Sequence, residues 1–262
     1  MTDDRNDPFF QYPRTDYATS DGPVGMPILY FDASVMMALF FTDPGKARSL
    51  LEKDGFEPVR FGNGKALVGV AFYEYRNTTI GDYNEVGVAV AAVPPGTPLP
   101  FSPLLSLMRH PDKNRVGLHI IDLPVTTSAA CAAGRDIWGY PKFVTPIRFA
   151  VAGARFDGAV SDPETGGEIL TLSGRVGPGV PAPLLDLVLY SRLDGRILRG
   201  TANTRGGGTL SLPGSLRLNV SDGGTHRMAR NLRALGLADA RPAFVSRSNT
   251  LQLRLNAGAV VG

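Results

Sequence analysis

Lys142 is the residue whose type and surroundings most clearly point to chemistry. The chain has 27 lysine and arginine residues, and only five of them are lysines. Lys142 lies among aromatic and aliphatic residues, in the run Ile137-Trp138-Gly139-Tyr140-Pro141-Lys142-Phe143-Val144. Arginine stays protonated, whereas a lysine removed from water can lose its proton and attack a carbonyl carbon, which gives a Schiff base. A lysine whose stem crosses an apolar surface and whose ammonium reaches water fits the same run, so both interpretations stay open.

Glu85 is the second candidate, because it opens an apolar strand in the segment Asp82-Tyr83-Asn84-Glu85-Val86-Gly87-Val88-Ala89-Val90. A carboxylate that points inward from such a strand can transfer protons during catalysis. A glutamate that faces water at the edge of a strand fits the segment as well, and charged residues are more often exposed than buried.

The element that must position Lys142 is a helix predicted over Ser128–Trp138. Thr126 or Thr127 can cap its start, and Gly139 and Pro141 end it abruptly. Lys142 therefore lies where a helix gives way to a strand, and a side chain between two regular elements is held more firmly than one on a loop. Arg135 in this helix could bind a substrate carboxylate in a bidentate fork, or pair with Asp136 or a neighbouring strand.

Strand patterns dominate the rest of the chain, as short runs rich in β-branched, aromatic or alternating apolar residues. We expect strands over residues 66–75, 85–93, 116–123, 143–151, 169–176, 184–190, 216–220 and 250–255. The apolar residues 25–41 predict a buried strand pair or a strand and a turn, and Asp157-Gly158 and Asp194-Gly195 predict hairpin turns. The intervals are too short for repeated βαβ crossovers, so the sheet should be largely antiparallel.

Two further helices are predicted. The first is capped by Asp43, begins at Pro44 and ends near Gly55. The second runs from Thr225 to Gly236 with its apolar residues on one face.

Composition excludes several classes of function. The net charge is only +3 and the basic residues are scattered, so nucleic acid is not an expected partner. The single cysteine, Cys131, cannot form an internal disulfide, and no secretory signal or membrane span is evident, which together predict a cytoplasmic protein without a membrane partner. The three histidines and Cys131 lack metal-ligand spacing, so neither a metal nor a cofactor is expected.

A longer run around Lys142 resembles the signature of the acetoacetate decarboxylase superfamily. It extends from Leu123-Pro124-Val125-Thr126-Thr127 through Gly134-Arg135-Asp136 to Tyr140-Pro141-Lys142, and the family's Schiff-base lysine stands at its last position. The upstream Tyr83-Asn84-Glu85 is similar to the family segment that bears its catalytic glutamate. Acetoacetate decarboxylase is itself the standard example of a lysine activated in this way, so the covalent role of Lys142 is taken from the resemblance.

The resemblance implies a mainly β, α+β fold, in which a large curved antiparallel sheet closes into a cone-like barrel with a few peripheral helices. Residues 1–24 would form an N-terminal extension and residues 25–262 a single domain. It also implies a homo-oligomer and a Schiff-base lyase that acts on a small keto acid. Lys142 and Glu85 would be catalytic, and Arg135, Trp138, Tyr140 and Phe143 would contact the substrate.

Two positions depart from the decarboxylases proper. These enzymes carry a second lysine after the nucleophile, where this chain has Phe143. They also carry an arginine near the substrate carboxylate, where an ungapped alignment places Ala33. Losing both cations argues against decarboxylation and leaves imine chemistry intact. The alternatives are therefore a pyruvate-dependent aldolase-dehydratase of the same superfamily, or a non-catalytic member that binds a small molecule.

Overall fold

The structure, a computed structural model, describes residues 6–261. The first five residues of the predicted N-terminal extension lie outside the described residues, as does residue 262. Within the described part, β1 (Thr15–Tyr17) pairs with β2 (Val24–Met26), just before the main sheet begins.

Seven strands of the main sheet close into a barrel, in the order β17-β3-β5-β6-β7-β13-β14 and back to β17. Their bounds are β3 (Ile28–Thr42), β5 (Ala66–Thr78), β6 (Tyr83–Val93), β7 (Gly117–Val125), β13 (Leu187–Leu193), β14 (Arg196–Arg205) and β17 (Phe244–Leu255). Neighbours pair antiparallel except β7 and β13, which are parallel. The predicted cone-like barrel with a largely antiparallel sheet is therefore confirmed.

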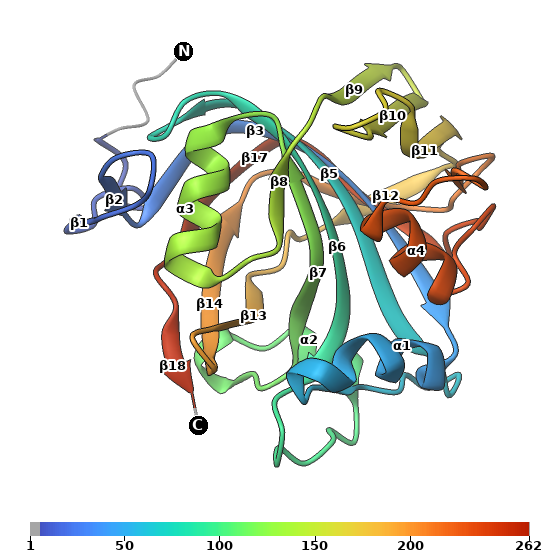
Figure 1. The fold of residues 1–262 in the computed structure, drawn as a ribbon, viewed down its shortest axis with the longest axis horizontal. Helices are drawn as coiled ribbons and strands as arrows, with labels where there is room; N and C mark the ends of the chain where they lie inside the picture. The colour runs from blue at the N-terminus through green and yellow to red at the C-terminus, as the bar shows by residue number, and fades with distance from the viewer. Residues whose placement is uncertain (1–5, 262) are drawn as a thin grey trace.

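Shorter strands extend this sheet, and a second sheet packs beside it. The extensions are β4 (Glu57–Pro58), β8 (Lys142–Val144), β12 (Gly179–Ala182), β15 (Gly208–Ser211) and β18 (Ala259–Val261). The second sheet has the order β16-β11-β10-β9, made of β16 (Arg217–Val220), β11 (Glu168–Arg175), β10 (Arg155–Ser161) and β9 (Ile147–Ala152). Figure 1 shows β9, β10 and β11 together at one end of the barrel strands.

The described residues form four α-helices, which are α1 (Pro44–Leu51), α2 (Pro103–Leu107), α3 (Ser128–Trp138) and α4 (Arg227–Ala234). In Figure 1, α3 lies on one side of β7 and β8, and α1 and α4 lie on the other. Among the described residues, no helix is long and apolar enough to cross a membrane.

The barrel sheet separates two apolar cores, because successive side chains of a strand point to opposite faces. On β6, Val86, Val88 and Val90 pack into a core with α1, α4 and the second sheet. Tyr83 and Ala89 pack into another core, which includes α3. We call the face that carries Tyr83, Glu85 and Ala89 the site face, and the opposite one the back face.

Several sequence predictions need correction. Residues 25–41 form the end of β2 and then one continuous strand, β3, rather than a strand pair or a strand and a turn, because β3 stays paired with β5 through a register shift around Asp32. The predicted strand 143–151 is divided into β8 and β9. Asp157-Gly158 lies inside β10 rather than at a turn, since a Cβ at Gly158 would lie 2.7 Å from the Phe72 ring and only glycine allows the two sheets to approach. The predicted turn at Asp194-Gly195 is confirmed between β13 and β14.

The helix predictions were closer to the structure. Asp43 caps α1 by accepting from the backbone amides of Gly45 and Lys46, with Pro44 at the first position. The last helix begins at Arg227, two residues later than predicted, because the His226 side chain caps it. Helix α2 was missed, since it is only five residues long.

Asp122 attaches α4 to the back face of β7. It is fully buried, with Oδ1 2.8 Å from Arg227 Nη2 and with Oδ2 accepting from Asn231 Nδ2 at 2.8 Å. Burial raises the pKa of Asp122 to about 6, and its two partners on α4 limit the rise. Arg227 also donates to the carbonyl of Pro141 at 3.3 Å, so α4 touches the segment that precedes Lys142.

The Asp122→Asn substitution should change how stability depends on pH. A carboxyl with a raised folded-state pKa favours the folded state when protonated, so its stabilisation is fully present below pH 3.8 and lost as pH rises through about 6. By linkage the difference is up to about 3 kcal/mol. Urea unfolding at about pH 4.5 and about pH 7.5 should therefore show that the wild type gains stability over the variant at the lower pH. The surface variant Asp222→Asn is the control, and equal pH dependence of wild type and Asp122→Asn would contradict the prediction.

Candidate active site

Lys142 and Glu85 meet in a buried ion pair. Lys142 Nζ donates to Glu85 Oε2 at 2.6 Å, and the two residues are 7% and 8% exposed. Neither side chain faces water, so the solvent-facing alternatives for both residues do not describe this structure. A charged pair removed from water is costly unless its members are close and well oriented, as they are here.

The strands around β7 bring the two residues together across 57 positions of sequence. Strand β6 pairs antiparallel with β7, with Glu85 opposite Val125. Strand β8 pairs parallel with the same end of β7, with Leu123 opposite Lys142. Asn84 reinforces this end, because its backbone amide donates to Thr126 Oγ1 at 2.9 Å.

Helix α3 fixes the approach to Lys142. Thr127, one of the two predicted caps, accepts from the amide of Ala130, and Gly139 ends the helix in the left-handed conformation at φ 69°. A Cβ at Gly139 would lie 2.2 Å from the carbonyl oxygen of Arg192, so glycine is required for packing as well as for the turn. Three residues later the chain enters β8 at Lys142.

Gly134 leaves room for the aliphatic part of the Lys142 side chain, a role that was not predicted from the sequence. A Cβ at Gly134 would lie 2.3 Å from Lys142 Cε and 2.4 Å from Cδ, so the stem of Lys142 passes directly over the surface of α3. Glycine in the middle of a helix costs about 1 kcal/mol relative to alanine. A glycine that follows four alanines in the same helix was the signal in the sequence that could have identified the position.

Tyrosines surround the Glu85 carboxylate. Five of the eight in the chain (Tyr30, Tyr73, Tyr75, Tyr83 and Tyr140) have their pKa raised, first by burial and also by the Glu85 charge. Their hydroxyls therefore stay protonated. Only Tyr83 and Tyr140 lie in the segments that the sequence singled out, because the others reach the site through the pairing of β3 with β5 and of β5 with β6.

Two hydrogen bonds order this tyrosine cluster. Tyr75 donates to Glu85 Oε1 at 3.4 Å, and the hydroxyls of Tyr30 and Tyr83 are 2.8 Å apart. The Lys142 ammonium lies 5.8 Å from the centroid of the Tyr83 ring, within range of a cation–π interaction. The amine thus has a carboxylate on one side and aromatic rings around it.

The other four predicted site residues lie in three different places. Trp138 and Tyr140 are buried on the site face with their rings stacked 5.6 Å apart. Phe143 lies on the back face of β8, where its ring is 4.7 Å from that of His226. Arg135 is exposed on α3, and its Nε donates to the backbone carbonyl of Lys142 at 2.8 Å.

These placements change how the two departures from the decarboxylases are interpreted. Since alternate residues of β8 face opposite ways, a side chain at position 143 points away from the Lys142 amine. The identity of residue 143 therefore says little about charge beside the lysine. Ala33, by contrast, is fully buried in the core of the site face, opposite Tyr75 in the register of β3 and β5.

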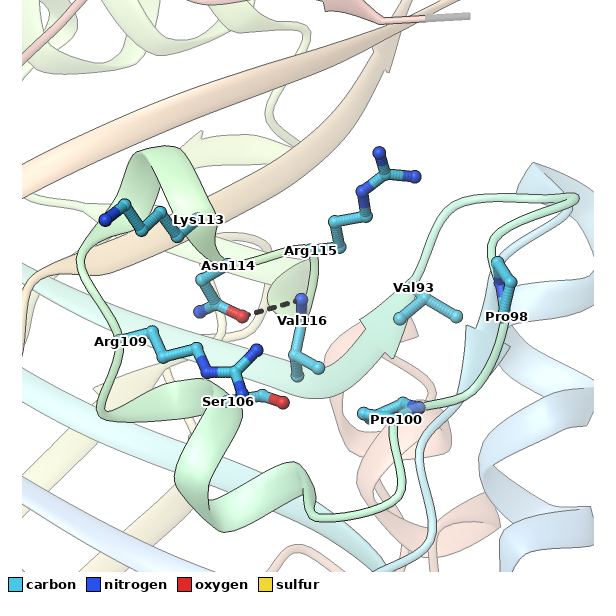
Figure 2. Close-up of a pocket in the computed structure, with 9 residues that line it drawn as sticks. All are labelled: Val93, Pro98, Pro100, Ser106, Arg109, Lys113, Asn114, Arg115 and Val116. Carbon is cyan, nitrogen blue, oxygen red and sulfur yellow. Dashed lines mark hydrogen bonds between the residues drawn. The ribbon is translucent and has the colours of Figure 1, made fainter.

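The pocket in Figure 2 is separate from the candidate active site. It has a volume of about 240 Å³ and lies where β6 ends and β7 begins, lined by Val93, Pro98, Pro100, Ser106, Arg109, Lys113, Asn114, Arg115 and Val116. Val93 is eight residues from Glu85 on β6, or roughly 26 Å along an extended strand. None of its lining residues belongs to the predicted site. Within residues 6–261, no group of three or more His, Cys, Asp or Glu side chains is arranged to hold a metal ion.

Solved structures with this fold include acetoacetate decarboxylases and an enzyme of enduracididine biosynthesis. Acetoacetate decarboxylase from Legionella pneumophila superposes with a TM-score of 0.66 at 19% identity, covering 96% of this chain and 92% of its own. Another acetoacetate decarboxylase gives a TM-score of 0.61 at 17% identity, covering 90% and 89%. The enduracididine biosynthesis enzyme MppR, in complex with the condensation product of pyruvate and imidazole 4-carboxaldehyde, gives 0.58 at 18% identity, covering 89% and 88%.

At such identities these superpositions show a shared fold alone. No curated protein matches the chain. The family model for acetoacetate decarboxylase, however, matches residues 11–231, which is most of the sequence. The chain therefore belongs to the acetoacetate decarboxylase family, and the resemblance seen in the sequence is confirmed.

The Gly134→Ala substitution should displace Lys142 without unfolding the protein. Alanine favours a helix by about 1 kcal/mol over glycine, and the flexible lysine stem can move aside. We expect labelling of Lys142 by an aldehyde and borohydride to slow by about 10- to 100-fold, since small displacements of reacting groups cost this much. Peptide mass mapping measures the labelling. Gly62→Ala, at a position with open space around it, is the control. Labelling of Gly134→Ala at the wild-type rate would show that the stem does not need this path.

Proposed function

We propose that this protein is a carbon–carbon lyase that forms an imine between Lys142 and a small keto acid. The contact between Lys142 Nζ and Glu85 Oε2, buried on the site face, is the observation that carries the proposal. The names of the solved relatives, which include decarboxylases and a pyruvate-condensing enzyme, support the same chemistry.

The geometry suggests how the reaction begins. An ammonium cannot attack a carbonyl, so Lys142 must first give up a proton, and Glu85 is within direct transfer distance at 2.6 Å. The free amine then adds to the carbonyl carbon to give a carbinolamine. Proton transfer to its oxygen, by way of Glu85, lets water leave and gives the protonated imine.

The imine then acts as an electron sink. In decarboxylation, the electron pair of the bond to the carboxylate carbon moves towards the imine nitrogen as carbon dioxide leaves. Glu85, which is a carboxylate again once water has left, takes up a proton from solvent and passes it to the enamine carbon, and water then hydrolyses the imine to release the ketone. Tyr75 holds Glu85 Oε1, which leaves Oε2 directed towards the lysine.

Aldol condensation followed by dehydration is the second candidate. Here the enamine derived from pyruvate attacks an aldehyde, and the adduct then loses water. The burial of Ala33 favours this branch, because the decarboxylases that the sequence resembles carry an arginine for the substrate carboxylate at the aligned position. Phe143 does not contribute to this argument, since it lies on the back face. A non-catalytic protein that binds a small molecule is the alternative from a different class.

Borohydride trapping tests the proposal. Incubation with acetoacetate or pyruvate and borohydride should label Lys142, because its amine is buried beside a proton acceptor, and should spare the exposed Lys53 and Lys113. Peptide mass mapping locates the label. The Lys142→Arg variant keeps a cation beside Glu85 and should remain unlabelled. If no keto acid labels Lys142 in the wild type, the lyase proposal fails and the binding protein becomes the better hypothesis.

Two assays separate the enzymatic branches. We expect carbon dioxide release from acetoacetate to be feeble, and absorbance of a conjugated product to appear with pyruvate and an aromatic aldehyde. The Glu85→Gln variant should lower turnover by about 100- to 10,000-fold, the usual contribution of a general acid or base. Borohydride should still trap the imine on this variant, but more slowly than on the wild type, because water must then exchange the protons that Glu85 carries during imine formation. Rapid carbon dioxide release without a condensation product would instead favour decarboxylation over aldol condensation.

A further inference from the structure

The pocket between the end of β6 and the start of β7 carries positive charge without counter-ions (Figure 2). Its nine lining residues include Arg109, Lys113 and Arg115 and no carboxylate. Within residues 6–261, none of these three side chains forms a hydrogen bond or an ion pair. The described part of the protein therefore leaves the charge of this pocket unneutralised.

The acidic residues closest to the pocket in the chain and in the sheet do not face it. Asp112 lies between lining residues, but its carboxylate is 80% exposed to water and lies 3.4 Å from His110 Nδ1. Glu57 is opposite Val93 in the pairing of β4 with β6, and it forms an ion pair with Arg48. Neither acid lines the pocket, so an anion that enters meets cations alone.

Asn114 adds a buried hydrogen-bond donor. The residue is 4% exposed, and its Oδ1 accepts from the backbone amide of Val116 at 2.8 Å, which fixes the side-chain amide and identifies the other atom as nitrogen. This Nδ2 has no partner within the described residues. Figure 2 shows Nδ2 turned away from Val116, on the side of the Arg109 guanidinium. A buried donor without a partner is rare because it destabilises the protein, so Nδ2 needs an acceptor from elsewhere.

The wall that carries these groups is fixed to the barrel. Arg199 of β14 donates from Nη2 to the carbonyl of Pro111 at 2.5 Å, and Tyr190 of β13 donates to the carbonyl of Arg115 at 3.0 Å. Burial raises the pKa of Tyr190, and the charges of Arg199 and Arg115 oppose that rise, so their positive charge acts on neighbouring groups. A wall that is ordered before a ligand arrives loses little freedom on binding.

The opposite side of the pocket is apolar. Val93 at the end of β6 and the rings of Pro98 and Pro100 form it, across from Arg109 and Asn114 in Figure 2. The volume of about 240 Å³ is below the range of about 300–1,000 Å³ that is typical of sites for drug-sized ligands. The pocket therefore suits a small molecule with one anionic end and a short apolar body.

We propose that this pocket binds a small organic phosphate, whose phosphate group accepts hydrogen bonds from Arg109 and Asn114 and whose apolar body lies against the valine and proline side. A phosphate monoester carries about −1.5 to −2 charges at neutral pH and three terminal oxygens, which match these unneutralised donors better than the single charge of a carboxylate. Arginine binds phosphate through two parallel hydrogen bonds. The exposed Lys113 and Arg115 add to the attraction. The pocket shares no residue with the Lys142 site, so this proposal does not depend on imine formation.

Three anions test the class of ligand. The Kd of propyl phosphate, butyrate and inorganic phosphate is measured by isothermal titration calorimetry on the full chain at one ionic strength. Propyl phosphate and butyrate carry the same three-carbon chain and differ in the anionic group. We expect propyl phosphate to bind at least about tenfold more tightly than butyrate, the effect of one further charged hydrogen bond. It should bind about three- to thirtyfold more tightly than inorganic phosphate, which has no chain to bury.

Two variants locate the binding site. Arg109→Gln removes an exposed cation and should weaken the binding of propyl phosphate by about 10- to 100-fold. Arg155→Gln is the matched control, because it removes the same charge from an exposed position on β10 and should bind as the wild type does. Asn114→Asp keeps an acceptor for the Val116 amide but replaces the donor with a negative charge, so binding should be lost.

Several results would overturn the proposal: no heat of binding with propyl phosphate at millimolar concentration, butyrate binding as tightly as propyl phosphate, or wild-type affinity in Arg109→Gln. If Asn114→Asp does not fold, Arg109→Gln decides the matter by itself. Borohydride trapping on Lys142 separates this proposal from the lyase proposal, because Arg109→Gln should be trapped as rapidly as the wild type. Propyl phosphate binding that is lost in Arg109→Gln supports the phosphate site even where no keto acid is trapped on Lys142.

Discussion

The buried pair of Lys142 and Glu85 is the interaction around which the structure of the site is organised. Two charges can be held away from water only if they are close and well oriented. Here β7 meets this condition by pairing with β6 on one side and β8 on the other, so that both side chains face the same way. The pair is close enough to exchange a proton, which the proposed imine chemistry requires.

Several features near the pair cost stability and are explained by it. Gly134 weakens α3 but lets the lysine stem cross the helix, and Gly139 ends that helix against the backbone of Arg192. Among the described residues the Tyr140 hydroxyl has no partner, whereas the hydroxyls of the buried Tyr30, Tyr75, Tyr83 and Tyr190 each have one. Natural proteins accept such costs where function requires them, and their concentration around Lys142 supports the choice of this site over the pocket between β6 and β7.

The two faces of the barrel sheet carry different cores. The back face carries the large apolar core with α1, α4 and the second sheet, and Asp122 ties α4 to it. The site face carries a smaller core rich in tyrosine, in which a carboxylate and an amine can be kept from water. The surroundings of a residue depend on the face to which its side chain points. Lys142 and Phe143 are adjacent in sequence, and their side chains lie on opposite sides of the sheet. The expected homo-oligomer and cytoplasmic location remain predictions.

The sequence by itself determined the local features: the caps at Asp43, Thr127 and Gly139, the predominance of strands, and Lys142 as the candidate nucleophile at the end of a helix. These depend on neighbouring residues, whose preferences can be recognised in a short segment. Only the tertiary structure decided that Glu85 meets Lys142, that Tyr30 and Tyr75 surround them, that Phe143 faces away, and that Asp157-Gly158 lies within a strand. Strand register and the packing between sheets decide these, because they join residues far apart in the chain, and a shift of one position would turn every side chain to the other face.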